Sequence, residues 1–165
     1  PVYVGFGSML DRVDGEKTVR VVVEGLKRTG RRGIISGVGK LEDLPPDVLA
    51  IDAAPHAWLF PRMAAVCHHG GAGTSAAGFR AGVPSIIVPF ALDQFAWARR
   101  SFELGVGAPP IPAKRLTAEG IAGAVRYATR DEVVEKAQEL GRKIATENGA
   151  HDSAKVIAEA ILVGS

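Results

Sequence analysis

Apolar residues along the chain follow two patterns, short unbroken runs and helical spacing. The unbroken runs lie at residues 2–6, 34–35, 48–51, 64–68 and 85–88. Each run ends at glycine, proline or polar residues, as expected of strands buried on both faces of a sheet. Between most of these runs, apolar residues recur every three or four positions, which is typical of a helix face. The alternation predicts a doubly wound parallel sheet in an α/β domain.

Helix-start and helix-end signals flank the periodic stretches. Asp14 is placed to cap the first helix and Gly30 to end it. A helix of small residues should end near Gly82, and another should run from Asp93 to Gly105. Three amphipathic helices are expected to complete the domain, over residues 117–129, 131–148 and 151–163.

Two of these expected helices carry an apolar face. The helix that starts at Asp93 presents Phe95 and Phe102. The last helix presents Ile157 and Ile161 at helical spacing. The helix from Asp93 also carries Ala98.

Composition indicates one soluble globular domain over residues 1–165. The chain is 47% hydrophobic and 23% charged, with 20 Lys and Arg against 18 Asp and Glu. Charges of both signs are mixed, so no nucleic-acid-binding face is expected. No apolar stretch reaches the length of a membrane span, and the N-terminus does not resemble a signal peptide. A single cysteine, Cys67, excludes an intrachain disulfide and makes a cytoplasmic location the expectation.

The chain opens on an apolar run rather than on methionine. We therefore expect it to be one piece of a longer protein. The missing part becomes important for function, because a domain of this size need not hold a complete active site.

Common cofactor and metal motifs fit poorly. After Gly5 and Gly7, Leu10 occupies the third glycine position of a dinucleotide fingerprint. Around Lys40, Leu41 stands where a P-loop needs Ser or Thr. Consecutive side chains of a strand point to opposite faces, so the Cys-His-His run at 67–69 is a poor zinc site. No cofactor and no metal are expected.

The segment from His69 to Thr74, which reads His-Gly-Gly-Ala-Gly-Thr, is the strongest candidate binding site. Its glycines let a ligand approach the backbone, and the helix that follows offers unpaired N–H groups to an anion. Thr74 and His69 can each add a hydrogen bond to a diphosphate. The alternative interpretation is that the glycines only permit close packing of strand and helix.

Asp93 and Gln94 follow the next strand at its carboxyl end. A carboxylate beside a carboxamide can bind vicinal hydroxyls of a sugar. Asp93 can equally serve as a helix N-cap, and the two roles are compatible. Because carboxyl ends of parallel strands share one edge, this pair is expected beside the glycine segment.

These motifs together resemble the C-terminal, donor-binding domain of GT-B glycosyltransferases of the UDP-glycosyltransferase type. The likeness is to sterol 3-beta-glucosyltransferases and to bacterial enzymes that glycosylate natural products. It extends over nearly the whole chain and implies a Rossmann-like fold, the C-terminal half of GT-B. The segments that carry it are 5–9, 55–60, 68–74, 82–84 and 89–94.

The resemblance assigns a role to each matching position. Gly7 and Ser8 would lie near the donor phosphates, and Pro55 and His56 would line the base pocket through backbone contacts. His69 would stabilise the leaving diphosphate. The other implied donor contacts are Gly71, Gly73 and Thr74 to the diphosphate, and Asp93 and Gln94 to the transferred sugar.

Other positions are assigned differently or depart from the plant-type pattern. Trp58 is expected in the core beneath the base pocket. His68 is expected either in packing or behind the residues that contact the ligand. Ala53 stands where the plant-type motif has a Trp stacked on uracil, and Ala77 where it has a Glu that binds ribose. UDP is the expected nucleotide, with dTDP as the alternative.

The resemblance implies a metal-independent, inverting transfer of a hexose, glucose by expectation, to a hydroxyl of a sterol-like or natural-product acceptor. The general base and the acceptor pocket would belong to an N-terminal domain of the same protein. This chain alone should bind the donor without turnover, and peripheral membrane contact of the full protein stays open. The alternatives are a stand-alone nucleotide-binding domain, or a transferase or epimerase that uses UDP-N-acetylglucosamine.

Overall fold

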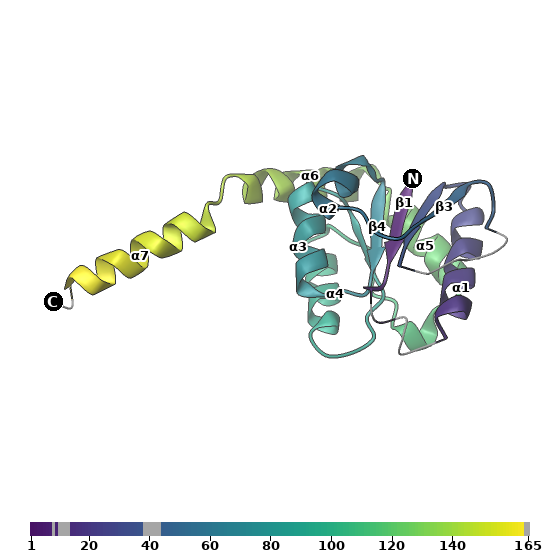
Figure 1. Cartoon of the computed structure of the whole chain (residues 1–165). Helices are drawn as coiled ribbons and strands as arrows, with labels where there is room; N and C mark the ends of the chain where they lie inside the picture. Colours follow the sequence, from purple (N-terminus) through teal and green to yellow (C-terminus); the bar gives the residue numbers. More distant parts are fainter. Residues whose placement is uncertain (8, 10–13, 38–43, 164–165) are drawn as a thin grey trace.

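A five-stranded parallel sheet forms the centre of the protein (Figure 1). The computed structural model describes residues 1–7, 9, 14–37 and 44–163. The strands follow the order β3-β2-β1-β4-β5. They are β1 (Val2–Gly5), β2 (Gly33–Ser36), β3 (Val48–Ile51), β4 (Ala65–His68) and β5 (Ser85–Ile87). The predicted doubly wound α/β fold is confirmed.

The helices lie close to their predicted ranges. They are α1 (Gly15–Lys27), α3 (Ala72–Ala81), α4 (Gln94–Glu103), α5 (Ala118–Ala128), α6 (Asp131–Ala145) and α7 (Gly149–Val163). Three short helical segments were not expected: α2 (His56–Leu59), η2 (Phe60–Arg62) and η3 (Ala113–Arg115). The Asp14 carboxylate accepts a hydrogen bond from Lys17 N at 3.0 Å, and Gly82 ends α3 in the left-handed conformation. Both predicted helix signals therefore act as expected.

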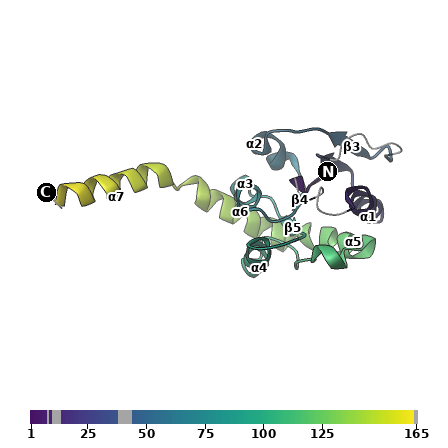
Figure 2. The ribbon, with the colours of Figure 1, turned by 60° about the horizontal axis from the view of Figure 1, so that its bottom comes forward.

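The side chains of β1 divide between two hydrophobic clusters, one on each face of the sheet. Val2, Val4 and Phe6 pack with α1 and α5. Tyr3 packs on the opposite face with Phe60 and the end of α2. In Figure 2, α1 and α5 lie on one side of the sheet, and α2 and α3 lie on the other. Both faces of the sheet are therefore covered, as unbroken apolar strands require.

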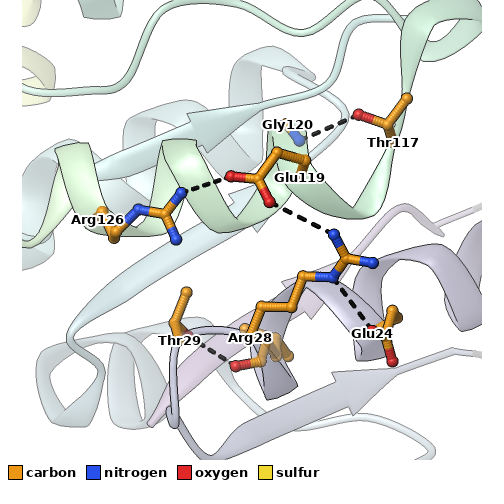
Figure 3. A network of polar contacts seen from close by, with 8 residues as sticks. Glu24, Arg28, Thr29, Thr117, Glu119, Gly120 and Arg126 are labelled. Atoms are coloured by element: carbon orange, nitrogen blue, oxygen red, sulfur yellow. Dashed lines mark hydrogen bonds and ion pairs between the residues drawn. The ribbon is translucent and has the colours of Figure 1, made fainter.

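Helices α1 and α5 are joined by close backbone packing and by an exposed ion-pair network (Figure 3). Glu119 pairs with Arg28 at 3.4 Å and with Arg126 at 2.7 Å. Hydrogen bonds from Arg126 and, with a smaller effect, from Arg28 lower the pKa of the Glu119 carboxyl. A Cβ on Gly25 would lie 2.6 Å from Ile121 Cγ2, so the helices meet where α1 has no side chain. Exposed ion pairs contribute little, and this packing is the main contact.

Helix α6 meets α3 at a pair of glycines. A Cβ on Gly141 would lie 2.8 Å from Gly82 Cα, and a Cβ on Gly82 would lie 3.2 Å from Gln138 Cα. Ala137 is buried in a cluster with Phe79 of α3. The C-terminal end of α3 is thereby held against α6.

Two of the expected helices expose apolar side chains. Phe95 and Phe102 of α4 are 46% and 40% exposed, and the helix buries Gln94, Ala98 and Ser101 instead. Helix α7 extends away from the rest of the chain in Figure 1. Its side chains are exposed from residue 151 to 161, including Ile157 at 60%. A pattern of apolar positions shows which face can pack, but not whether a partner is present.

The direction of chain progression reverses between β1 and β4. From β1 the chain builds β2 and β3 on one side, then returns to add β4 and β5 on the other. In open parallel sheets the crevice at this point, outside the carboxyl ends of the strands, is where ligands bind. The segments that leave β1 and β4 there begin at Phe6 and His69.

Candidate functional site

Loops that follow β1, β4 and β5 meet at the carboxyl edge of the sheet. A Cβ on Gly7 would lie 3.8 Å from His69 Cε1. The Gln94 amide nitrogen lies 3.4 Å from Met9 Sδ. The structure therefore brings the segments after β1, β4 and β5 together, as expected for the Asp93–Gln94 pair and the glycine segment. Ser8, predicted to lie near the phosphates, is outside the described residues.

The N-terminus of α3 is uncapped and faces the crevice. Gly71 is its N-cap residue and makes no side-chain cap hydrogen bond, and the first turn contains no acidic residue. The first backbone bond of the helix runs from Ser75 N to Gly71 O. The N–H groups of the preceding turn therefore retain their capacity to bind an anion, and the helix dipole favours negative charge there.

At the start of α3, the space beside Gly73 is open, whereas the space beside Gly71 is filled. A Cβ on Gly73 would meet nothing within 4 Å, and Gly73 is exposed. A Cβ on Gly71 would lie 2.5 Å from His69 Nε2, so the imidazole lies directly over this glycine. Thr74, one position further, is half-buried. The predicted diphosphate contacts thus surround one helix end.

His69 is half-buried at the same point. Its Nδ1 is buried and has no hydrogen-bond partner among the described residues. Burial lowers the pKa of the imidazole, and the carboxylate of Asp93 opposes that shift. A neutral imidazole still has one N–H, which can donate to a phosphate oxygen.

Asp93 is exposed and lies near His69. It occupies the N-cap position of α4, but its backbone is helical and its side chain makes no cap hydrogen bond. The cap role considered for it is therefore not observed. Leu92, just before it, is 88% exposed and has φ 54°, a conformation that is strained for a leucine. The Asp93 carboxylate remains available to a ligand.

Gln94 differs from Asp93 in its surroundings. Its side-chain oxygen accepts hydrogen bonds from Phe90 N at 2.8 Å and Ala91 N at 3.1 Å. Gln94 is 7% exposed. The amide thus holds the loop after β5 in shape, and its predicted contact with a sugar stays a prediction.

Pro55 and His56 lie on the face of the sheet that α2 covers. The His56 ring stacks on Phe60 with centroids 4.3 Å apart, and Tyr3 Oη lies 3.5 Å from His56 Nε2. The side chain is therefore used in packing. The carbonyl oxygens of Pro55 and His56 accept backbone hydrogen bonds at α2, and their contact with a base stays a prediction. Trp58, expected in the core, is 57% exposed under the guanidinium of Arg62. That expectation is wrong because α2 is a single turn that presents one side to solvent.

His68 is buried, as expected, but its contact with the glycine turn was not predicted. It is fully buried, and its Nδ1 accepts a hydrogen bond from Gly70 N at 3.1 Å. The available signal was its position immediately before the glycine turn. Within the described ranges, no group of three or more His, Cys, Asp or Glu residues could hold a metal ion. No helix in the described part of the chain has the length and apolar character of a membrane span.

Comparison with known proteins gives consistent results. The family described as "Erythromycin biosynthesis protein CIII-like, C-terminal domain" matches residues 35–162. Sterol 3-beta-glucosyltransferase UGT80B1 of Arabidopsis thaliana is 44% identical over 155 residues, which cover 90% of this chain and 25% of the plant protein. This chain therefore spans a quarter of the length of that relative.

Solved structures of bacterial-type glycosyltransferases share the fold. The calicheamicin glycosyltransferase CalG4 superposes with a TM-score of 0.81 and 26% identity, over 99% of this chain and 44% of CalG4. The glycosyltransferase VinC, solved in complex with dTDP, superposes with a TM-score of 0.73 and 26% identity, over 88% of this chain and 37% of VinC. The fold is that of one half of a GT-B glycosyltransferase.

Proposed function

Since the chain belongs to the family of erythromycin biosynthesis protein CIII-like C-terminal domains, we propose that it binds the nucleoside diphosphate sugar of an inverting glycosyltransferase. The observation that carries the proposal is the uncapped start of α3, with the His69 imidazole over Gly71. Unpaired N–H groups, a helix dipole and an imidazole N–H all attract a diphosphate. No side chain of the first turn competes for them.

The sugar is proposed to lie toward α4. The Asp93 carboxylate is exposed and does not cap its helix, and it lies close enough to His69 to affect the pKa of that imidazole. A diphosphate held at α3 would therefore place its attached hexose near a carboxylate that accepts hydrogen bonds from hydroxyls. Gln94 joins it in the proposal, through the side-chain N–H that does not donate to Met9 Sδ.

UDP-glucose is the proposed donor. The support is the likeness to sterol 3-beta-glucosyltransferases, which share more than two fifths of the aligned residues with this chain. The VinC structure, which contains dTDP, favours dTDP as the second candidate. The pyrimidine would lie toward Pro55 and His56, whose backbone is free of the stacking that occupies the His56 ring.

The proposed reaction is a single displacement at the anomeric carbon. An acceptor hydroxyl forms a bond to that carbon as the bond to the diphosphate oxygen breaks, with inversion. Charge accumulates on the leaving diphosphate, where the α3 N–H groups and His69 stabilise it without requiring a metal. The general base and the acceptor pocket, for a sterol-like or natural-product hydroxyl, are proposed to lie in an N-terminal domain of the same protein.

Calorimetric titration of the chain with UDP-glucose tests this proposal. We expect wild type to bind, with a dissociation constant that EDTA does not change. His69→Ala should weaken binding about tenfold to a hundredfold, the worth of one hydrogen bond to a charged group. His151→Ala, in the exposed helix α7, is the matched control and should bind like wild type. Absence of binding by the folded wild-type chain to both UDP-glucose and dTDP-glucose would overturn the proposal.

A further inference from the structure

The two adjacent histidines at the end of β4 have different surroundings. His69 lies over the start of α3, half-buried. His68 is fully buried, on the sheet face that it shares with Val66 of the same strand. It cannot reach solvent, so it needs a role other than direct contact with an exposed ligand.

One such role is visible in its hydrogen bond. His68 Nδ1 accepts from Gly70 N at 3.1 Å, and the bond is buried. Gly70 has φ 92°, a backbone conformation that side chains rarely adopt. A buried side-chain acceptor therefore holds the N–H of the most unusual residue in the glycine turn.

The turn is also fitted closely against its neighbours. A Cβ on Gly70 would lie 2.7 Å from Ile87 Cγ2 and 3.1 Å from Gln94 O. The peptide of Gly70 thus lies between β5 and the first residue of α4. Any rotation of that peptide would move His69 on one side and Gly71, the N-cap of α3, on the other.

The hydrogen bond also defines the tautomer of His68. Because Nδ1 accepts, the proton of the neutral ring is on Nε2, which is buried and has no partner among the described residues. Burial, followed by the nearby His69 and His56, lowers the pKa of His68 to about 3. The ring therefore remains neutral, with Nδ1 as an acceptor, at pH values well above 3.

We propose that His68 is a positioning residue for the donor diphosphate: its Nδ1 holds the Gly70 N–H and so fixes the turn that aims His69 and the start of α3 at one point. The inference rests on the proposed function. It adds a role for the first histidine of the pair, which acts through the backbone and not on the ligand.

Two substitutions separate the hydrogen bond from packing. His68→Asn keeps an acceptor, because Asn Oδ1 is attached at the same distance from Cβ as His Nδ1, but it removes more volume. His68→Leu fills more of the space and leaves the Gly70 N–H without a partner. Cys67→Ala is the control for a neighbouring loss of volume, since Cys67 is 2% exposed and packs in the cluster on the opposite face.

The readout is the dissociation constant for UDP, measured by calorimetry on the chain, beside the thermal midpoint of each variant. We expect His68→Leu to bind UDP at least tenfold more weakly, the worth of one hydrogen bond. His68→Asn should stay within about threefold of wild type, although its thermal midpoint falls further. Cys67→Ala should bind like wild type. If packing alone mattered, His68→Asn would be the weaker binder, and that order would overturn the inference.

A second measurement uses the wild-type chain without ligand, so its result does not depend on whether the variants fold. Long-range ¹H–¹⁵N spectra of the wild-type imidazole should show His68 with an unprotonated Nδ1 and a protonated Nε2. A protonated Nδ1 would overturn the inference. If wild type does not bind UDP, the proposed function fails and the inference with it. If wild type and His68→Leu bind UDP equally, only the inference fails.

Discussion

Asp93 is the residue whose role separates sugar binding from helix capping. Its side chain makes no cap hydrogen bond, so removing it should cost α4 little. We expect Asp93→Ala to weaken binding of UDP-glucose about tenfold, because a carboxylate that accepts from sugar hydroxyls is lost. Binding of UDP, which has no sugar beyond its ribose, should stay within about twofold. Calorimetry with both ligands measures the difference.

The control for Asp93 is Asp131→Ala, which removes a carboxylate from the first turn of α6. It should leave both dissociation constants unchanged. An equal loss for UDP and UDP-glucose in Asp93→Ala would contradict the assignment to the sugar.

His68 also makes stability depend on pH. Its pKa is lowered to about 3 in the folded chain, whereas an unfolded histidine titrates near pH 6.5. Between these values the unfolded chain binds a proton that the folded chain does not. The contribution of this residue to stability is therefore fully present above about pH 6.5 and is lost as pH falls toward 3, by on the order of 5 kcal/mol in all.

Urea denaturation at pH 7, 6 and 5 measures this effect. Carboxylates contribute to the acid loss with the same sign, so the comparison is with His68→Asn, which lacks the titrating ring. The free energy of unfolding of wild type should fall more steeply than that of the variant. If the free energies of unfolding of wild type and His68→Asn fall equally with pH, the pKa of His68 is not lowered by folding.

The role of a residue could be predicted where its type serves one common purpose next to a helix terminus. The roles of the glycine turn and of His69 were predicted this way. The start of α3 is uncapped, and the roles themselves stay predictions. Gln94 and His68 were harder, because each satisfies backbone N–H groups of a loop whose conformation only the fold determines. Sequence spacing does not contain that geometry.

At the scale of elements, strands and long helices followed from the apolar pattern. All five runs became parallel strands. The segment from His56 to Arg62 was missed because α2 and η2 are each about one turn long, too short for periodicity to appear. Trp58 was misplaced for the same reason, since its orientation depends on that turn.

Close packing between α1 and α5 depends on Gly25, which has no side chain at their contact. Gly25→Ala would place a methyl group 2.6 Å from Ile121 Cγ2 and 2.9 Å from Ala118 O. We expect a loss of about 1–3 kcal/mol in the free energy of unfolding, because the helices must separate. Chemical denaturation measures it.

Gly123→Ala in α5 is the matched control. Its Cβ would meet nothing within 4 Å, so the higher helix propensity of alanine should stabilise the chain by about 0.5–1 kcal/mol. If both variants lose the same stability, the separation between α1 and α5 is not set by Gly25.

At the scale of the whole molecule, α7 is the helix that extends away from the rest of the domain. Its side chains from 151 to 161 are exposed, and Val156 and Ile157 are apolar. Figure 1 shows the helix leaving the domain beyond α6.

Truncation tests whether α7 belongs to the cooperative unit. Removing residues 146–165 should change the thermal midpoint by no more than about 2 °C and leave UDP affinity intact, since little buried surface is lost. Removing residues 131–165 also takes away α6, whose Ala137 is buried against Phe79, and should prevent cooperative unfolding. A large loss in the shorter truncation would mean that α7 packs on the domain in solution.

The glycine contact between α3 and α6 has a mechanical consequence. One end of α3 presents its N–H groups to the crevice, while the other end touches α6 with backbone against backbone at Gly82 and Gly141. Contact this close leaves no side chains to absorb sliding. We therefore expect α3 and α6 to move together, so that the distance between spin labels on α6 and at the start of α3 stays constant when α6 shifts relative to the sheet.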